Sequence, residues 1–172
     1  MENTASTDSR AELLEIPGDP LALERQVCFA LSVAARSVLS TYRPVLEPMG
    51  LTHPQYLVML ALWGQSPLAV KELIEVLQLD GPTLSPMLKR LEAAGLVTRT
   101  RDPRDERQLR AGLTEKGHAL RRQALNVPPA VVAKLGLSLG ELQELHRGLT
   151  TLNEAARRAG VKPLPAPAKD SI

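Results

Sequence analysis

Apolar residues recur at helical spacing along most of the chain, and the clearest stripe follows Asp80. Between Leu84 and Leu91 they fall at i, i+3, i+4 and i+7, which predicts one buried face of a helix. Asp80 is a good N-cap, Pro82 fits a first helical turn, and Gly95 is placed to end the helix. Polar side chains off the stripe are expected to face outward: Thr83, Ser85, Lys89 and Arg90.

A β-hairpin is predicted directly after this helix. Residues 96–101 (LVTRTR) have the β-branched content of a strand, residues 102–105 (DPRD) are turn chemistry, and residues 108–113 can return as the second strand. Residues 68–70 predict a short third strand, and residues 71–79 a preceding helix. A helix pair followed by an arginine-rich hairpin indicates a winged helix-turn-helix, which puts a helix in the major groove of DNA and a hairpin in the minor groove.

Further helices are predicted on the N-terminal side of this unit. Asp19-Pro20 opens a long amphipathic helix with apolar residues spaced by threes and fours up to Val45. Pro44, Pro48 and Gly50 are expected to end it. A second helix is expected to begin at residues 52–54 (THP).

On the C-terminal side, Thr114 is predicted to cap a helix that runs to Ala124, and residues 127–129 (VPP) must interrupt or kink it. Ser138-x-x-Glu141 is a capping box that opens the last helix. That helix carries leucines at coiled-coil spacing, at positions 142, 145, 149 and 152. Because a small central domain leaves this seam uncovered, we predict a dimer interface in place of intramolecular core.

The predicted fold is therefore mainly α with a small β-wing: a winged helix-turn-helix flanked by N- and C-terminal dimerisation helices. The expected parts are a flexible N-terminal arm (1–18), a helical dimerisation region (19–50 and 114–160), a DNA-binding domain (51–113) and a proline-rich tail (161–172).

Charge alone does not decide whether the chain binds nucleic acid. The net charge of 172 residues is +2, with a pI near 8.9. Three acidic residues reduce the positive charge of the hairpin, which contains five arginines, at positions 99, 101, 104, 107 and 110. A solvated charged face therefore stays open beside DNA binding.

Sequence features also bear on location and chemistry. No apolar run approaches the ~20 residues that span a bilayer, and residues 1–15 lack a basic start and an apolar core, so we expect no signal peptide and no membrane partner. A single cysteine permits no intrachain disulfide, which suits the cytoplasm. No phosphate loop, nucleophile elbow or catalytic carboxylate pair indicates an enzyme or a cofactor. The few histidines have no metal-ligand spacing.

Two motifs resemble the MarR family of bacterial transcriptional regulators. One is Asp105-x-Arg107 followed by Leu113-Thr114-x-x-Gly117, and the other is residues 88–97 (LKRLEAAGLV). The resemblance implies a homodimer that binds a pseudo-palindromic DNA operator. It makes Arg107, with Arg104 at the hairpin tip, the expected wing contact, and Asp105 the residue that orients it.

In the helix, the expected DNA contacts divide by position. Thr83, Ser85 and Pro86 lie near its start and should approach base edges, while Lys89 and Arg90 suit phosphate or guanine. The plainer alternatives are a solvated helix surface and a hairpin salt bridge of little energetic value. A winged-helix protein adaptor is the rival function, and it would lack the salt dependence of DNA binding.

Several segments are similar to the organic-hydroperoxide-sensing branch of that family: residues 26–31 (QVCFAL), 42–46 (YRPVL), 54–57 (PQYL), 70–73 (VKEL) and 79–90. The resemblance implies that Cys28 is oxidised to a sulfenate, which then forms a mixed disulfide with a low-molecular-weight thiol or reacts further, and that the repressor then leaves DNA. Since no second cysteine exists, the chain would be a one-cysteine sensor.

Cys28 and Tyr42 are fourteen residues apart, on nearly the same face of one predicted helix but ~21 Å apart along its axis. They would meet if two such helices run antiparallel across a dimer, where the phenol would stabilise the Cys28 thiolate. The branch usually has tyrosines where this chain has Ser32 and His53. His53 could serve as a thiolate partner, mark a site for a small aromatic or anionic ligand in the dimer cleft, or lie in solvent. If it marks a ligand site, Cys28 is a structural residue.

Overall fold

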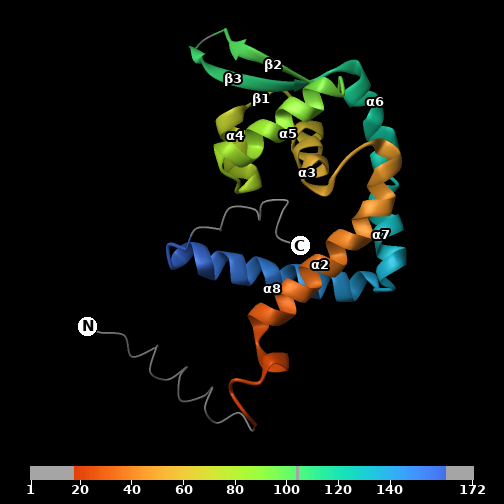
Figure 1. The fold of residues 1–172 in the computed structure, drawn as a ribbon, viewed down its shortest axis with the longest axis vertical. Coiled ribbons are helices and arrows are strands. Elements are labelled where there is room, and N and C mark those ends of the chain that lie inside the picture. The colour runs from red at the N-terminus through yellow and green to blue at the C-terminus, as the bar shows by residue number, and fades with distance from the viewer. Residues whose placement is uncertain (1–17, 104, 162–172) are drawn as a thin grey trace, which may run out of the picture. The chain divides into compact units, whose positions relative to one another are not determined.

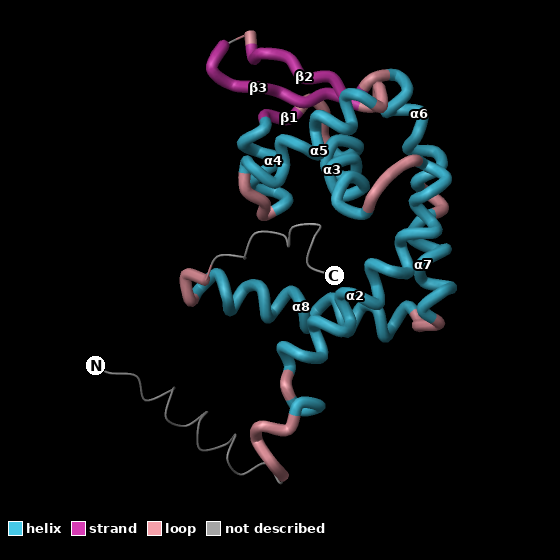
Figure 2. The backbone as a smooth tube through the Cα atoms, in the orientation of Figure 1, coloured by secondary structure: helices cyan, strands magenta, loops and turns pink. Residues whose placement is uncertain are grey.

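The computed structural model describes residues 18–103 and 105–161, and these are mostly helical (Figures 1 and 2). The chain divides into two compact units, residues 1–40 and residues 41–172. Residues 1–17 of the predicted arm and residues 162–172 of the predicted tail lie outside the described residues. The predicted domain boundaries stay a prediction.

The first unit contains a 3₁₀ turn, η1 (Leu23–Arg25), and most of helix α2 (Val27–Leu46). The predicted helix start at Asp19-Pro20 is wrong. The Asp19 carboxylate accepts from the Leu21 amide at 2.9 Å in a local turn, and extended backbone at Gln26 separates η1 from α2. No described residue of this unit is buried.

In the second unit, α2 continues through Pro44, which was expected to help end it, and stops at Leu46. Leu46 is completely buried, so packing holds the last turn although proline removes one hydrogen bond. A 3₁₀ turn, η2 (Glu47–Met49), and a left-handed Gly50 follow. Helix α3 (His53–Gly64) begins as predicted, with the Thr52 amide donating to Gln55 Oε1 at 2.9 Å.

The predicted winged helix-turn-helix is confirmed. Its elements are β1 (Leu68–Ala69), α4 (Val70–Leu77), α5 (Gly81–Ala93), β2 (Val97–Asp102) and β3 (Asp105–Leu113). The three strands pair antiparallel in the order β1-β3-β2. Strand β3 begins at Asp105, three residues before the predicted start, because Asp105 pairs with Asp102 across the turn. The β2–β3 hairpin extends along one side of α4 and α5 (Figure 2).

Three helices follow the wing: α6 (Glu115–Ala124), α7 (Val127–Leu135) and α8 (Leu139–Arg158). The interruption predicted at the two prolines is confirmed, since they occupy the first turn of α7. The capping box at the start of α8 is also confirmed, with the Ser138 amide donating to Glu141 at 2.8 Å. No residue of α8 is buried in this chain.

The apolar core lies within the second unit. Leu84, Leu88 and Leu91 of the predicted stripe are buried, and Met87 is half-buried. They pack with buried residues of the neighbouring elements, which include Met59, Leu62, Leu73, Leu96, Val97, Ala111, Ala124 and Val127. This burial fixes which face of α5 remains outside.

The Leu113-Thr114-x-x-Gly117 motif joins α6 to the end of α5. The Thr114 hydroxyl donates to the Gly95 carbonyl at 2.7 Å and accepts from the Gly117 amide at 3.0 Å. A Cβ on Gly117 would lie 2.1 Å from the Leu96 carbonyl oxygen, so only glycine fits. The Trp63 indole of α3 donates to the Gly117 carbonyl at 2.9 Å. The motif is therefore a packing joint between the wing base and two helices.

Replacing Gly117 by alanine should lower the free energy of unfolding by about 1–3 kcal/mol or more, because the new methyl group collides with backbone that cannot rotate away. Urea unfolding followed by the fluorescence of Trp63 measures this. Gly64→Ala is the matched control, since no atom lies within 4 Å of a Cβ there. Equal stability of both variants would show that α6 can shift to make room.

Candidate DNA interface and cysteine site

The start of α5 is fixed by its cap. Asp80 Oδ1 accepts from the Thr83 amide at 2.7 Å, and its hydrogen bonds with Thr83 hold the pKa of the Asp80 carboxyl below its ordinary value. Gln78, in the left-handed region at φ 52°, makes the turn between α4 and α5. The turn and the cap together set the direction of α5 relative to α4.

The outer face of α5 carries polar groups without internal partners. Ser85, Lys89 and Arg90 are exposed, as the stripe predicted, and Pro86 is exposed as well, whereas Thr83 is half-buried and that part of the prediction is wrong. Within the described part of the chain, the side chains of Ser85, Lys89 and Arg90 make no hydrogen bond or ion pair. These groups are available to an external ligand.

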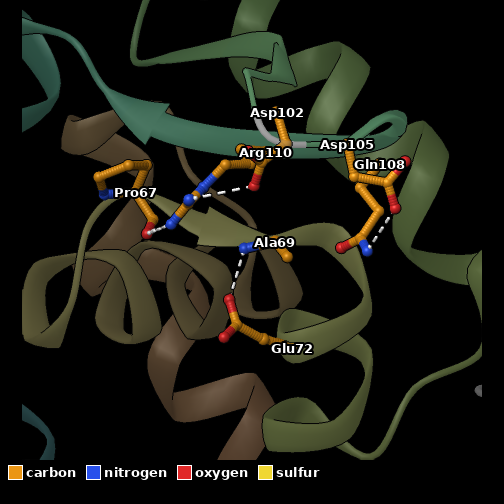
Figure 3. A network of polar contacts seen from close by, with 7 residues as sticks. All are labelled: Pro67, Ala69, Glu72, Asp102, Asp105, Gln108 and Arg110. Atoms are coloured by element: carbon orange, nitrogen blue, oxygen red, sulfur yellow. Dashed lines mark hydrogen bonds and ion pairs between the residues drawn. The ribbon is translucent and has the colours of Figure 1, made fainter.

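Two arginines of the wing, by contrast, are engaged inside the domain. Arg99 Nε donates to Glu92 Oε2 at 2.8 Å, and this contact lowers the pKa of the Glu92 carboxyl. Arg110 donates to Asp102 and to the Pro67 carbonyl (Figure 3). Sequence reasoning counted both among the hairpin arginines and missed these roles, since the contacts form only when the hairpin folds back.

Asp105 and Arg107, two of the residues predicted to act in the wing, belong to strand β3. Asp105 Oδ2 accepts from Gln108 Nε2 at 3.0 Å, within the same strand (Figure 3). The backbone of Arg107 belongs to β3, while its side chain and all of Arg104 lie outside the described residues. The predicted orientation of Arg107 by Asp105 therefore stays a prediction.

The structure brings together two of the three predicted sensor residues. The rings of Tyr42 and His53 are 4.9 Å apart between centroids, edge to face at 68°. Tyr42 also lies 6.1 Å from the Tyr56 ring, and Tyr56 lies 6.3 Å from Trp63. Cys28 belongs to the other compact unit, where it is exposed.

His53 is half-buried and does not lie in open solvent. Burial lowers the pKa of its imidazole from the ordinary 6.5, so the ring is neutral near pH 7. A neutral imidazole can donate one hydrogen bond to a thiolate, but it brings no positive charge. Burial also raises the pKa of the neighbouring Tyr56 phenol, and Tyr42 adds to this shift.

Two other features bear on the class of site. Among residues 18–103 and 105–161, no cluster of three or more His, Cys, Asp or Glu side chains is arranged to hold a metal ion. No helix in this part of the chain has the length and apolarity to cross a membrane.

The lowered pKa of His53 predicts a pH-dependent stability. As pH falls through about 6.5, the unfolded chain takes up the proton before the folded chain does, so the free energy of unfolding should decline and then level off below the folded-state pKa. Urea unfolding at pH 7.5, 6.5 and 5.5 measures this, and His53→Gln should flatten that part of the curve. His118→Gln makes the same substitution at an exposed site of α6 as a control. A His53→Gln curve that overlays the wild type would contradict the assignment.

Comparison with known proteins identifies the family. A model of the MarR family matches residues 51–109. The chain is 41% identical over 136 residues to the organic hydroperoxide resistance transcriptional regulator of Bacillus subtilis, covering 79% of this chain and 92% of that protein. It is 44% identical over 149 residues to the HTH-type transcriptional regulator TtmR of Methylorubrum extorquens, covering 86% and 76%.

Among solved structures, reduced AbfR bound to DNA superimposes with a TM-score of 0.70 at 34% identity, covering 80% of this chain and 94% of that one. AbfR is a protein of Staphylococcus epidermidis. With the winged fold and the outward-facing polar groups of α5, these matches show that the chain belongs to the MarR family and is a DNA-binding transcriptional regulator, not an enzyme.

Proposed function

We propose that this regulator is a homodimeric repressor that binds a pseudo-palindromic operator and leaves it when an organic hydroperoxide oxidises Cys28. The observation that carries the sensing role is that the only cysteine of the chain is exposed on α2, in a protein similar to a hydroperoxide regulator over nearly all of that relative's length.

Contact with DNA is assigned to α5 and the wing. Ser85, Lys89 and Arg90 are exposed and unpaired within the described residues, which suits hydrogen bonds to base edges and to phosphates. Pro86 and Thr83 lie on the same part of the helix and would make van der Waals contacts with the DNA. Arg107, with Arg104, would enter the minor groove, where the field of the phosphates attracts a guanidinium.

Dimerisation is assigned to the apolar faces of α2 and α8. In the single chain, side chains at coiled-coil spacing on α8 are left in water, with Leu145 50% and Leu152 44% exposed. Val27, Phe29 and Val33 of α2 are exposed as well. Burying such a seam against a second copy removes apolar surface from water.

The chemistry at Cys28 is a two-electron oxidation. The thiolate attacks the terminal oxygen of the hydroperoxide, an S–O bond forms as the O–O bond breaks, and the alkoxide leaves with a proton as an alcohol. A low-molecular-weight thiol then displaces water from the sulfenic acid and gives a mixed disulfide. Since there is no second cysteine in the chain, no resolving thiol within one subunit competes with this step.

The Tyr42–His53 pair is proposed to support the sulfur across the dimer. Antiparallel α2 helices would bring this pair of one subunit to Cys28 of the other, where the phenol and the neutral imidazole can each donate a hydrogen bond to the thiolate. Oxidation adds an oxygen and then a thiol adduct at this position. The Tyr42 and His53 rings would have to move aside, and this movement would alter the spacing of the two α5 helices of the dimer.

The test uses an operator selected from a random duplex library by the reduced protein. Binding of wild type and Cys28→Ser is measured before and after treatment with cumene hydroperoxide and a small thiol. Oxidant should weaken wild-type binding at least about fivefold, because a bulky adduct in a packed dimer interface costs about 1–3 kcal/mol or more. Cys28→Ser should stay bound.

A Cys28→Ser protein that is also released would overturn the redox role. If both proteins stay bound under oxidant, a second function gains support: release by a small aromatic or anionic ligand at the ring cluster. The half-buried Tyr42 and His53 rings favour that candidate, since they offer stacking surface and hydrogen bonds together.

A further inference from the structure

Arg110 occupies the middle strand of the sheet but reaches beyond it in two directions. Its strand neighbours are Ala69 of β1 and Thr100 of β2. Nη1 donates to Asp102 Oδ2 at 3.2 Å, and Nη2 donates to the Pro67 carbonyl at 3.0 Å (Figure 3). One guanidinium therefore connects two segments that lie far apart in the sequence.

One of the two segments belongs to the wing, and the other leads into the helix-turn-helix. Asp102 is the last residue of β2, where the pairing with β3 shifts register and the wing turn begins. Pro67 directly precedes β1, which leads into α4, and the Ala69 amide donates to Glu72 Oε2 at 2.6 Å in the first turn of that helix. The Arg110 side chain and its two contacts, with Asp102 and with the Pro67 carbonyl, are called the Arg110 bracket. The bracket joins the wing turn to the start of the helix-turn-helix.

The surroundings suit a positioning role better than a DNA contact. The Asp102 side chain is only 14% exposed and that of Arg110 32%, so solvent screens the pair less than an ordinary surface pair. The charge of Arg110 is largely offset by Asp102. Arg110 Nε is buried and has no hydrogen-bond partner within the described residues, so the two Nη groups make all the hydrogen bonds of the guanidinium there.

We infer that Arg110 is a positioning residue that sets the angle of the wing relative to the helix-turn-helix, and thereby lets the wing reach the minor groove while α5 occupies the major groove. The inference rests on the proposed contact between the wing and DNA. Lysine cannot replace arginine here, because a single ammonium lacks the planar fork that serves two acceptors on separate segments.

The experiment combines affinity with a map of contacts on the selected operator. Hydroxyl-radical footprinting reports the minor groove at the flanks, where the wing binds, and methylation protection of guanine reports the major groove, where α5 binds. Arg110→Lys keeps the charge but breaks the bracket. It should weaken binding at least about tenfold, the effect of losing a hydrogen bond to a charged group, and lose flank protection while keeping the major-groove contacts.

Three further variants sharpen the result. Asp102→Asn removes the charge of the wing-side acceptor and so weakens its bond with Arg110, and the double variant with Arg110→Lys should bind no worse than either single one. Arg99→Lys is the matched control, since both of its donor nitrogens reach the same Glu92 oxygen and one ammonium can replace them. Lys89→Met should give the opposite footprint, losing contacts of α5 and keeping the flanks.

Urea unfolding separates positioning from folding. The inference predicts that Asp102→Asn, with an unfolding midpoint near that of wild type, still loses the flank footprint. Wild-type affinity and footprint in both Arg110→Lys and Asp102→Asn would overturn it, as would a uniform loss of protection across the whole site. If wild type itself gives no flank protection while its major-groove contacts are present, the proposed wing contact fails first and the inference fails with it.

Discussion

The geometry of the DNA-binding domain depends on the close approach between the Gly117 backbone and the Leu96 carbonyl. The end of α5, the base of the wing and the start of α6 meet there, with space for no side chain. Thr114 closes the same joint by bonding both Gly95 and Gly117. Since α5 and the wing share this joint, they leave it in fixed directions, and the outer face of α5 presents Ser85, Lys89 and Arg90 as one surface.

The aromatic residues of α2 and α3 connect the proposed sensor to this joint. Tyr42 contacts His53 and Tyr56, Tyr56 contacts Trp63, and the Trp63 indole bonds the Gly117 carbonyl. Tyr42 is therefore linked to the wing base by two ring contacts and one hydrogen bond. At the other end of the wing, the contacts of Arg110 with Asp102 and the Pro67 carbonyl tie the wing turn to the residue before β1.

Much of the fold follows from local patterns. The α5 stripe, the Asp80 cap and the capping boxes depend on near neighbours in sequence, so periodicity and capping chemistry predicted them. The start of α2 was misplaced because Gln26 adopts extended backbone that no residue type requires. The roles of Arg99 and Arg110 could not be predicted, since their partners are chosen when the hairpin folds onto α5 and β1. Similarly, the pairing of His53 with Tyr42 needs the turn after α2.

We propose that occupancy of the operator follows the oxidation state of Cys28. The most direct measurement titrates the protein–operator complex with cumene hydroperoxide in the presence of a small thiol. Intact-mass spectrometry then gives the fraction of subunits that carry an added oxygen or thiol, and fluorescence anisotropy gives the fraction of DNA still bound. We expect release to rise in step with modification mapped to Cys28. Release from a protein of unchanged mass, or full modification with the DNA still bound, would contradict it.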